Sequence, residues 1–219
     1  MIDARARRLL LYFAAALLFF LLAGCAGWQS GSSFRDEFDP ADRSPVTAVK
    51  KWFKSMEWKE GEDGSRNPDN GRDFAYFLEV VNPEMLLDST GQFIGAEQLR
   101  DLEDRWNSRE WEVEFSEVVL EEGEMVDGER AVVKITDGKI RYIGEKMFGT
   151  VEYKIDSFKD KKGEIYLSWY EDPVNDPLLQ VAQMDEYRER FADIAGKGRW
   201  VVVGGLDLSE EKSWGKQAQ

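Results

Sequence analysis

The sequence predicts an α+β domain in which N-terminal helices pack on a curved antiparallel sheet. Up to residue 106, apolar residues recur at helical spacing, whereas from residue 111 the period is two and turn residues separate short β-prone runs. Helices and strands that are segregated along the chain are typical of α+β folds, because the helices then cover a sheet made of successive strands. We expect a single domain over residues 45–208, followed by a polar tail over residues 209–219.

The first helix is expected to begin after Ser44, which is a suitable N-cap, with Pro45 at the first helical position. Apolar residues at i, i+3, i+4 and i+7 share one face of this helix, and they are Val49, Trp52, Phe53 and Met56. The opposite face of this helix carries Lys50, Lys51 and Lys54.

Two further helices are predicted, over residues 72–81 and 96–106. Their expected inward residues are Phe74, Phe77, Leu78 and Val81 in the first, and Leu99, Leu102 and Trp106 in the second. The polar segment 61–73 between the first two helices is rich in side-chain oxygen. It fails the EF-hand pattern, because Pro68 stands where glycine is required and Phe74 where the bidentate glutamate is required.

The strand region begins with Trp111, Val113 and Phe115, which alternate with polar residues. Asp137-Gly138 lies between two β-prone runs and predicts a hairpin there. A second hairpin is expected to join residues 149–158 to residues 164–170.

The C-terminal region returns to helical spacing before a last strand. Met184, Tyr187, Phe191 and Ile194 predict a helix that ends at Gly196. The run Arg-Trp-Val-Val-Val within residues 199–204 predicts a strand that completes the sheet.

The N-terminus has the order of an export signal. Three arginines precede an uncharged apolar run over residues 9–23. The tetrad Leu22, Ala23, Gly24 and Cys25 lies at the end of this run. This tetrad resembles the lipobox of bacterial lipoproteins. The resemblance implies that residues 1–24 are a removed signal peptide and that residues 25–44 form a flexible linker. It also implies that Cys25 is the lipid attachment site, carrying a diacylglycerol and an N-terminal acyl chain such as palmitate.

The alternative for this segment is an uncleaved transmembrane anchor. The run of fifteen uncharged residues is short for that purpose, because a bilayer core of ~30 Å takes about 20 apolar residues. Both interpretations place the domain outside the cytoplasm. The lipoprotein interpretation predicts a location in the cell envelope, on the outer face of the cytoplasmic membrane or on the outer membrane.

Composition excludes several classes of function. Residues 25–219 carry 42 acidic and 26 basic side chains, a net charge of −16, which disfavours binding to nucleic acid. Cys25 is the only cysteine and histidine is absent, so disulfides and histidine-dependent nucleophile systems are excluded. No metal-binding or cofactor motif is found. We expect the acids of the linker to be a solvated cluster rather than a metal site, and these are Asp36, Glu37, Asp39 and Asp42.

Residues 44–206 resemble the exported domains of lipoproteins with the nuclear-transport-factor-2-like, cystatin-like fold. The resemblance rests on the proline-initiated helix over residues 44–56, the Asp137-Gly138 pair and the closing run over residues 198–203. Residues 174–196 form a longer connection than the family pattern has. The resemblance implies a cone whose sheet and helices enclose a cavity.

Two functions are compatible with such a cavity. We favour a non-catalytic domain that binds a small apolar ligand or an envelope protein. The alternative is an isomerase or lyase of the ketosteroid-isomerase-like type, in which an Asp base acts with Tyr. The residues that supply these types are Tyr76, Tyr142, Tyr153, Asp156 and Tyr166. Trp169, Tyr170 and Trp200 could stack on sugars, but we expect them to belong to the core.

Overall fold

The computed structural model describes residues 39, 41–62, 64–121, 125–146, 149–155, 158 and 163–206, all within one compact unit, Ser33–Gln219. The helices in these ranges are α2 (Pro45–Met56), α3 (Phe74–Val80), α4 (Gly95–Trp106), α5 (Leu178–Val181) and α6 (Arg188–Phe191), with 3₁₀ turns at Pro68–Asn70 and Pro83–Leu86. The strands are β1 (Trp111–Glu121), β2 (Met125–Asp127), β3 (Arg130–Lys146), β4 (Gly149–Ile155), β5 (Glu164–Tyr170) and β6 (Arg199–Gly204). The predicted α+β class, with helices on a curved antiparallel sheet, is confirmed.

Several sequence-based predictions lie outside the described residues. They concern the tetrad Leu22, Ala23, Gly24 and Cys25, the export signal that contains it, and the tail over residues 209–219. No helix in the described ranges is long and apolar enough to cross a membrane.

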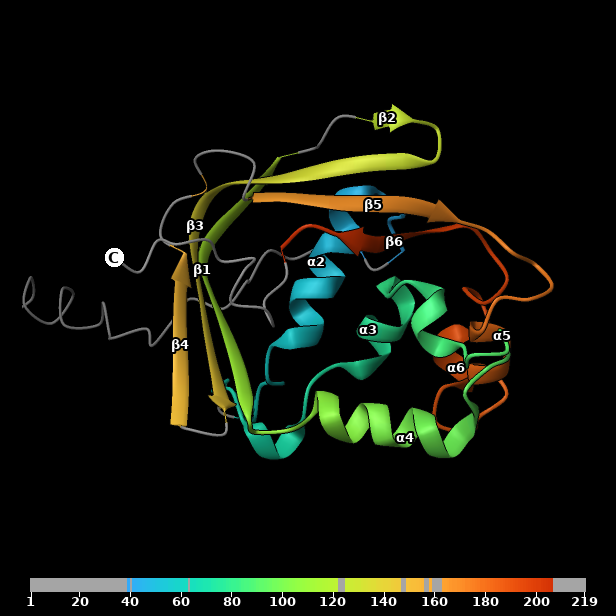
Figure 1. Cartoon of the computed structure of the whole chain (residues 1–219), viewed down its shortest axis with the longest axis horizontal. Helices are drawn as coiled ribbons and strands as arrows, with labels where there is room; N and C mark the ends of the chain where they lie inside the picture. Colours follow the sequence, from blue (N-terminus) through green and yellow to red (C-terminus); the bar gives the residue numbers. More distant parts are fainter. Residues whose placement is uncertain are drawn as a thin grey trace, which may run out of the picture. The chain divides into compact units, whose positions relative to one another are not determined.

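The sheet is organised around β3, its longest strand. β1 pairs with one edge of β3, while the other edge pairs with β5 along Arg130–Lys134 and with β4 along Ile140–Lys146. β6 then pairs with β5, which gives the order β1-β3-β5-β6. Figure 1 shows β1 and β3 curving from one half of the sheet into the other, with α2 and α3 on the concave side.

The predicted hairpin at Asp137-Gly138 is wrong, because β3 continues through it. Gly138 has φ 108°, and the pairing of β1 shifts between Ser116 and Val119 opposite it, where Glu117 also has a positive φ. A Cβ atom at position 138 would lie 2.5 Å from the Cα atom of Val118. The pair is therefore the corner of a β-bulge that bends the sheet, and it uses the same positive φ that a tight turn requires.

The second predicted hairpin is also wrong. β4 and β5 do not pair with each other in the described sheet, since each pairs with a different half of β3. A strand of 17 residues is long enough to hold both on one edge. The tight Asp-Gly turn lies at Asp127-Gly128 instead, where β2 meets β3 and the Asp127 carboxylate accepts a hydrogen bond from the Glu129 amide at 2.9 Å.

Helix α2 begins as predicted, and its apolar face packs on the sheet. The Ser44 hydroxyl accepts a hydrogen bond from the Thr47 amide at 3.2 Å. Phe53 is fully buried and stacks on Phe115 with ring centroids 4.5 Å apart. Lys51, which lies off the predicted apolar face, is nevertheless buried, and its ammonium group forms an ion pair with Glu79 of α3.

The helix expected around residues 184–194 is limited to one turn, α6, with α5 preceding it. Tyr187 and Phe191 are buried, together with Leu178 and Val181 of the α5 turn. The apolar spacing therefore identified the inward side chains, although a series of turns satisfies that spacing as well as a continuous helix does. The closing strand β6 is confirmed.

Candidate functional site

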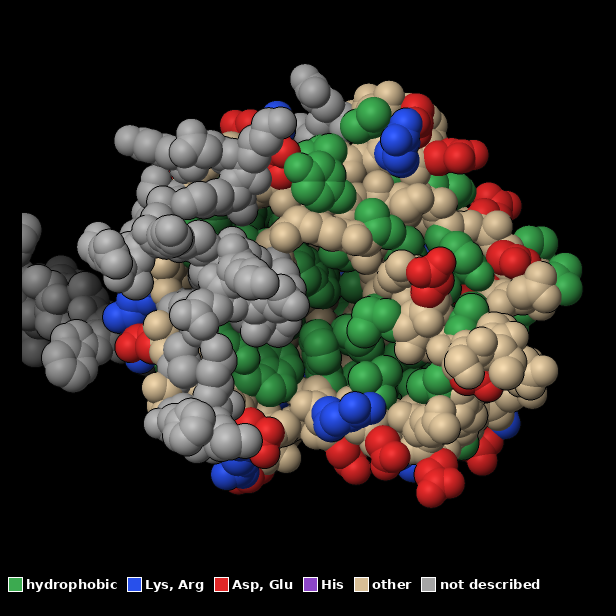
Figure 2. Space-filling view, in the orientation of Figure 1, with side chains coloured by type: hydrophobic (Ala, Val, Ile, Leu, Met, Phe, Trp, Pro, Cys, Tyr) green, Lys and Arg blue, Asp and Glu red, His purple; other side chains and the backbone are tan. Residues whose placement is uncertain are grey.

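An apolar cavity of about 590 Å³ lies between the concave face of the sheet and the helices. Its wall is built by α2, α3, α4, β1, β3 and the residues that end β6. Figure 2 shows hydrophobic side chains gathered around a central hollow on this face. Small-molecule sites have volumes of roughly 300–1,000 Å³ and mostly apolar walls, so the size and lining of this cavity are those of a ligand site.

Aromatic side chains form the rigid part of the wall. Trp106 of α4 lies 4.1 Å from Phe77 and 5.2 Å from Trp111 between ring centroids, and its indole N–H donates to the Ser55 carbonyl at 2.7 Å. Trp52 is half-buried on the same wall, one turn before Met56. Because the indole N–H of Trp106 is already bonded, its ring presents mainly apolar surface to the cavity.

The polar side chains of the wall are few. Among the described lining residues, Arg105 is the only charged group and Tyr142 carries the only hydroxyl. Neither Asp nor Glu is among them. The wall therefore lacks, within the described part of the chain, the carboxylate that an Asp/Tyr mechanism requires.

The other predicted catalytic candidates lie elsewhere. Tyr76 of α3 stacks against Arg190, whose guanidinium carbon lies 4.3 Å from the ring centroid. Tyr166 is exposed and donates a hydrogen bond to Glu164 at 2.8 Å, which raises the pKa of its hydroxyl. Asp156 and the side chain of Tyr153 lie outside the described residues. Of the three candidates whose side chains are described, only Tyr142 lies on the cavity wall.

A buried arginine, Arg72, holds one end of the cavity in place. Its guanidinium lies between the indoles of Trp58 and Trp111, 3.4 and 3.6 Å from their centroids. It donates to the carbonyls of Met56 at 3.0 Å and Trp106 at 2.6 Å, and also to those of Ser108 and Trp111. Burial lowers its pKa to about 9. This one side chain thus ties the ends of α2 and α4 to the start of β1.

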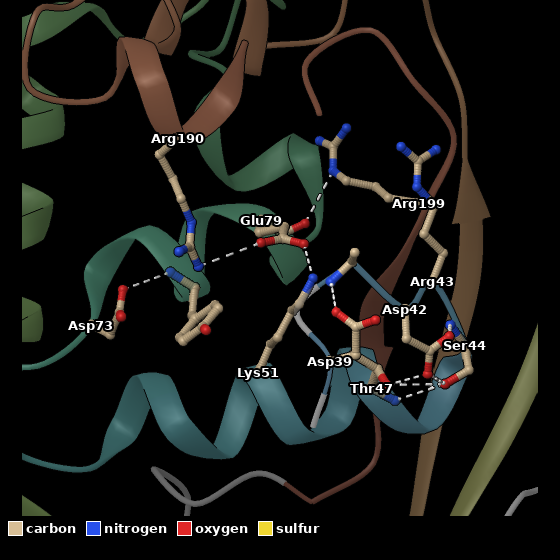
Figure 3. Close-up of polar contacts among 12 residues, drawn as sticks. Asp39, Asp42, Arg43, Ser44, Thr47, Lys51, Asp73, Glu79, Arg190 and Arg199 are labelled. Carbon is tan, nitrogen blue, oxygen red and sulfur yellow. Dashed lines mark hydrogen bonds and ion pairs between the residues drawn. The ribbon is translucent and has the colours of Figure 1, made fainter. Parts of the chain in front are cut away.

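A second cavity, of about 320 Å³, is lined by charged residues from α2, α3, α6 and β6. Lys51 forms a buried ion pair with Glu79. The guanidinium of Arg199 meets both carboxylate oxygens of Asp176, at 2.6 and 2.9 Å, and donates to the Glu79 carbonyl at 3.1 Å. We call Lys51, Glu79, Asp176, Arg190 and Arg199 the charged cluster. Figure 3 shows Glu79 between Lys51 and Arg190.

Positive and negative groups alternate in the charged cluster. Arg190 lies 3.9 Å from the second carboxylate oxygen of Glu79, and its guanidinium stacks on Tyr76. Lys51 and Arg199 find carboxylate partners within the chain, whereas Nε and Nη2 of Arg190 form no hydrogen bond in the described structure. The paired charges connect α2, α3 and β6. No group of three or more described Cys, Asp or Glu residues is placed to hold a metal ion.

The aromatic pair of the closing strands belongs to the core. Trp200 is buried, and Trp169 opposite it on β5 is partly buried in the same cluster, with ring centroids 5.4 Å apart. Tyr170 is partly buried and lies near Arg199, whose guanidinium carbon is 5.0 Å from the ring centroid. This arrangement agrees with the expectation of a packing role.

Comparison with protein-family models, with curated proteins and with solved structures finds no match for this chain.

Sequence reasoning placed several wall residues on inward helical faces, among them Trp52, Phe77 and Trp106, but it connected only Tyr142 with the chemistry of a cavity. Arg105 follows the inward residue Leu102 by three positions and precedes the inward Trp106, so its place near the interior was visible in the helical spacing. Val202 and Leu206 carried no such signal. Their place on the wall depends on how β6 ends beside α3, where Val81 forms a bridge to Val202.

Proposed function

We propose that the protein is a lipid-anchored protein of the cell envelope whose domain binds a small apolar ligand without catalysing a reaction. The observation that carries this proposal is the apolar cavity, with its aromatic wall of Trp52, Trp106 and Trp111. An apolar ligand would gain hydrophobic and dispersion energy in such a site. The cone of the nuclear-transport-factor-2-like fold is the architecture that we propose for it.

The anchor is supported by the order of basic residues, apolar run and Cys25. Two or three acyl chains would hold the domain at the membrane permanently, since each buried methylene contributes about 0.8 kcal/mol. The non-catalytic assignment is supported by the absence of Asp and Glu from the described cavity wall.

Photo-crosslinking of the lipidated full chain in nonionic detergent tests ligand binding. The probe is a long-chain alcohol that carries a diazirine, and mass spectrometry maps where it attaches. We expect crosslinks on peptides of the cavity wall. Val202→Trp should reduce them because Val202 lines the cavity, whereas Val203→Trp should not, because Val203 is exposed. Crosslinks that are absent from the wall, or equal in both variants, would contradict ligand binding there.

Intact-mass measurement of the membrane fraction tests the anchor. We expect a chain that begins at Cys25 with lipid attached, and a Cys25→Ser variant that loses this modification. A species that retains residues 1–24 in the wild type would support the uncleaved anchor instead. If the cavity binds no ligand, an envelope protein becomes the preferred partner, and capture by crosslinking in intact cells would then identify it.

A further inference from the structure

The described wall of the cavity has two polar side chains, Arg105 and Tyr142, and the charged one, Arg105, is exposed at the mouth. The indole N–H of Trp111 donates to the Arg105 carbonyl at 3.3 Å, so residue 105 lies against Trp111. Trp111 is opposite Gly144 in the pairing of β1 with β3. The Tyr142 hydroxyl lies over Gly144, within 2.7 Å of where a Cβ atom would be. The backbone of residue 105 and the Tyr142 side chain therefore lie near Trp111, where α4 meets β1, while the Arg105 side chain is directed back along α4.

Arg105 is suited to meet an anion at the cavity mouth. Its Nε atom donates to the Asp101 carbonyl at 3.1 Å, one turn earlier in α4. No carboxylate of the described chain forms an ion pair with its guanidinium, although the chain has 43 acidic residues. Arg105 is exposed, so a group bound to it would remain in contact with water at the cavity mouth.

The rest of the wall has no charged side chain. Val81 and Met85 from the region of α3, and Val202 and Leu206 from the end of β6, are apolar wall residues. A charged ligand group placed among them would lose its hydration without a partner, at considerable cost. The cavity is therefore amphipathic, with an apolar body and one cationic end.

We propose that the ligand is a single-chain amphipathic carboxylic acid, with its hydrocarbon chain in the cavity and its carboxylate at Arg105. This inference rests on the proposed ligand-binding function and names its ligand class. A volume of about 590 Å³ suits one chain of moderate length. A guanidinium forms an ion pair and two parallel hydrogen bonds with a carboxylate, whereas an alcohol of the same length offers it a single neutral acceptor.

The experiment compares two diazirine probes of equal chain length, a fatty acid and the corresponding alcohol, on the lipidated full chain in nonionic detergent at pH 8. We expect the acid to reach half-maximal crosslinking to the wall at a concentration lower by about tenfold or more than the alcohol. Arg105→Gln should abolish this difference and leave the alcohol unaffected. Arg100→Gln, an exposed arginine of the same helix that is not on the wall, is the control and should change neither probe.

Equal crosslinking of acid and alcohol in the wild type, or an acid preference that survives Arg105→Gln, would overturn the carboxylate assignment and leave apolar binding standing. If neither probe reaches the wall, the proposed function itself fails.

Discussion

The two cavities differ in whether the chain itself supplies interaction partners for the side chains that line them. In the charged cluster, Lys51 and Arg199 meet Glu79 and Asp176, which are supplied by other elements of the same chain. The described chain covers the aromatic wall of the apolar cavity only in part, since Trp52, Trp106 and Trp111 are half-buried. Buried charges that pair with one another link the elements of a fold, whereas an apolar surface that the described chain does not cover gains energy only from an occupant. The difference favours a structural role for the charged cluster and supports the ligand binding that we propose for the apolar cavity.

The largest expected effect is the loss of stability when an ion pair of the charged cluster is removed. Asp176→Ala leaves the buried guanidinium of Arg199 without its carboxylate and removes the acceptor of the Leu178 and Gly196 amides. Removal of one partner of a buried ion pair costs about 3–5 kcal/mol in the free energy of unfolding. Chemical denaturation measures the loss. Asp193→Ala is the control, because the Asp193 side chain is 99% exposed and should cost no more than about 0.5 kcal/mol.

A smaller effect on stability is expected from truncating an aromatic residue of the apolar cavity wall. Trp52 lines the cavity and is half-buried, whereas its neighbour Phe53 is fully buried in the core. We expect Trp52→Ala to cost about 1–2 kcal/mol of stability, because part of its surface is already exposed. Phe53→Ala should cost about 3–5 kcal/mol, as for aromatic truncations in cores. Trp52→Ala should also weaken crosslinking of the alcohol probe. Equal stability losses would show that Trp52 is a core residue rather than a wall residue.

The smallest effect concerns pH at the edge of the charged cavity. Hydrogen bonds from Thr47 at 2.6 Å and Ser44 at 2.8 Å lower the pKa of the Asp42 carboxyl below its ordinary value. The folded chain therefore binds this proton less readily than the unfolded chain. The resulting stabilisation is present above about pH 3.9, the ordinary value, and is lost as pH falls through the lower folded pKa.

Because Asp42 is exposed, its contribution should be below about 1 kcal/mol. Urea denaturation at pH 6 and at pH 3 measures it. The loss on acidification should be smaller in Asp42→Asn than in the wild type, and identical losses would refute a lowered pKa.

Local patterns predicted the helices well, because caps and apolar spacing act within a few residues. Ser44 and Pro45 begin α2 as their types suggest. The Asp137-Gly138 pair shows the limit of such patterns: a tight turn and a bulge both need a residue with positive φ, and only the pairing of β1 with β3 distinguishes them.

The charged cluster and the cavity were beyond local reasoning. Lys51 and Glu79 are 28 residues apart, and no local sequence pattern around either residue predicts that they pair. The cavity wall joins residues from Trp52 to Leu206, so its composition is set by how the elements pack. Lys51 is buried although lysine is usually exposed, because a partner that is distant in the sequence pairs with its charge.

The position of Arg72 has a consequence for how the molecule opens. Segment 57–73 is polar and rich in turn residues, a composition usually found in loops that unfold locally. Its last residues, however, include a guanidinium bonded to carbonyls at positions 56, 106, 108 and 111. The segment cannot leave without releasing the ends of both helices and the start of β1. Its amide hydrogens near Arg72 should therefore exchange with solvent only when the whole domain opens, and this loop would behave as part of the most cooperative unit of the fold.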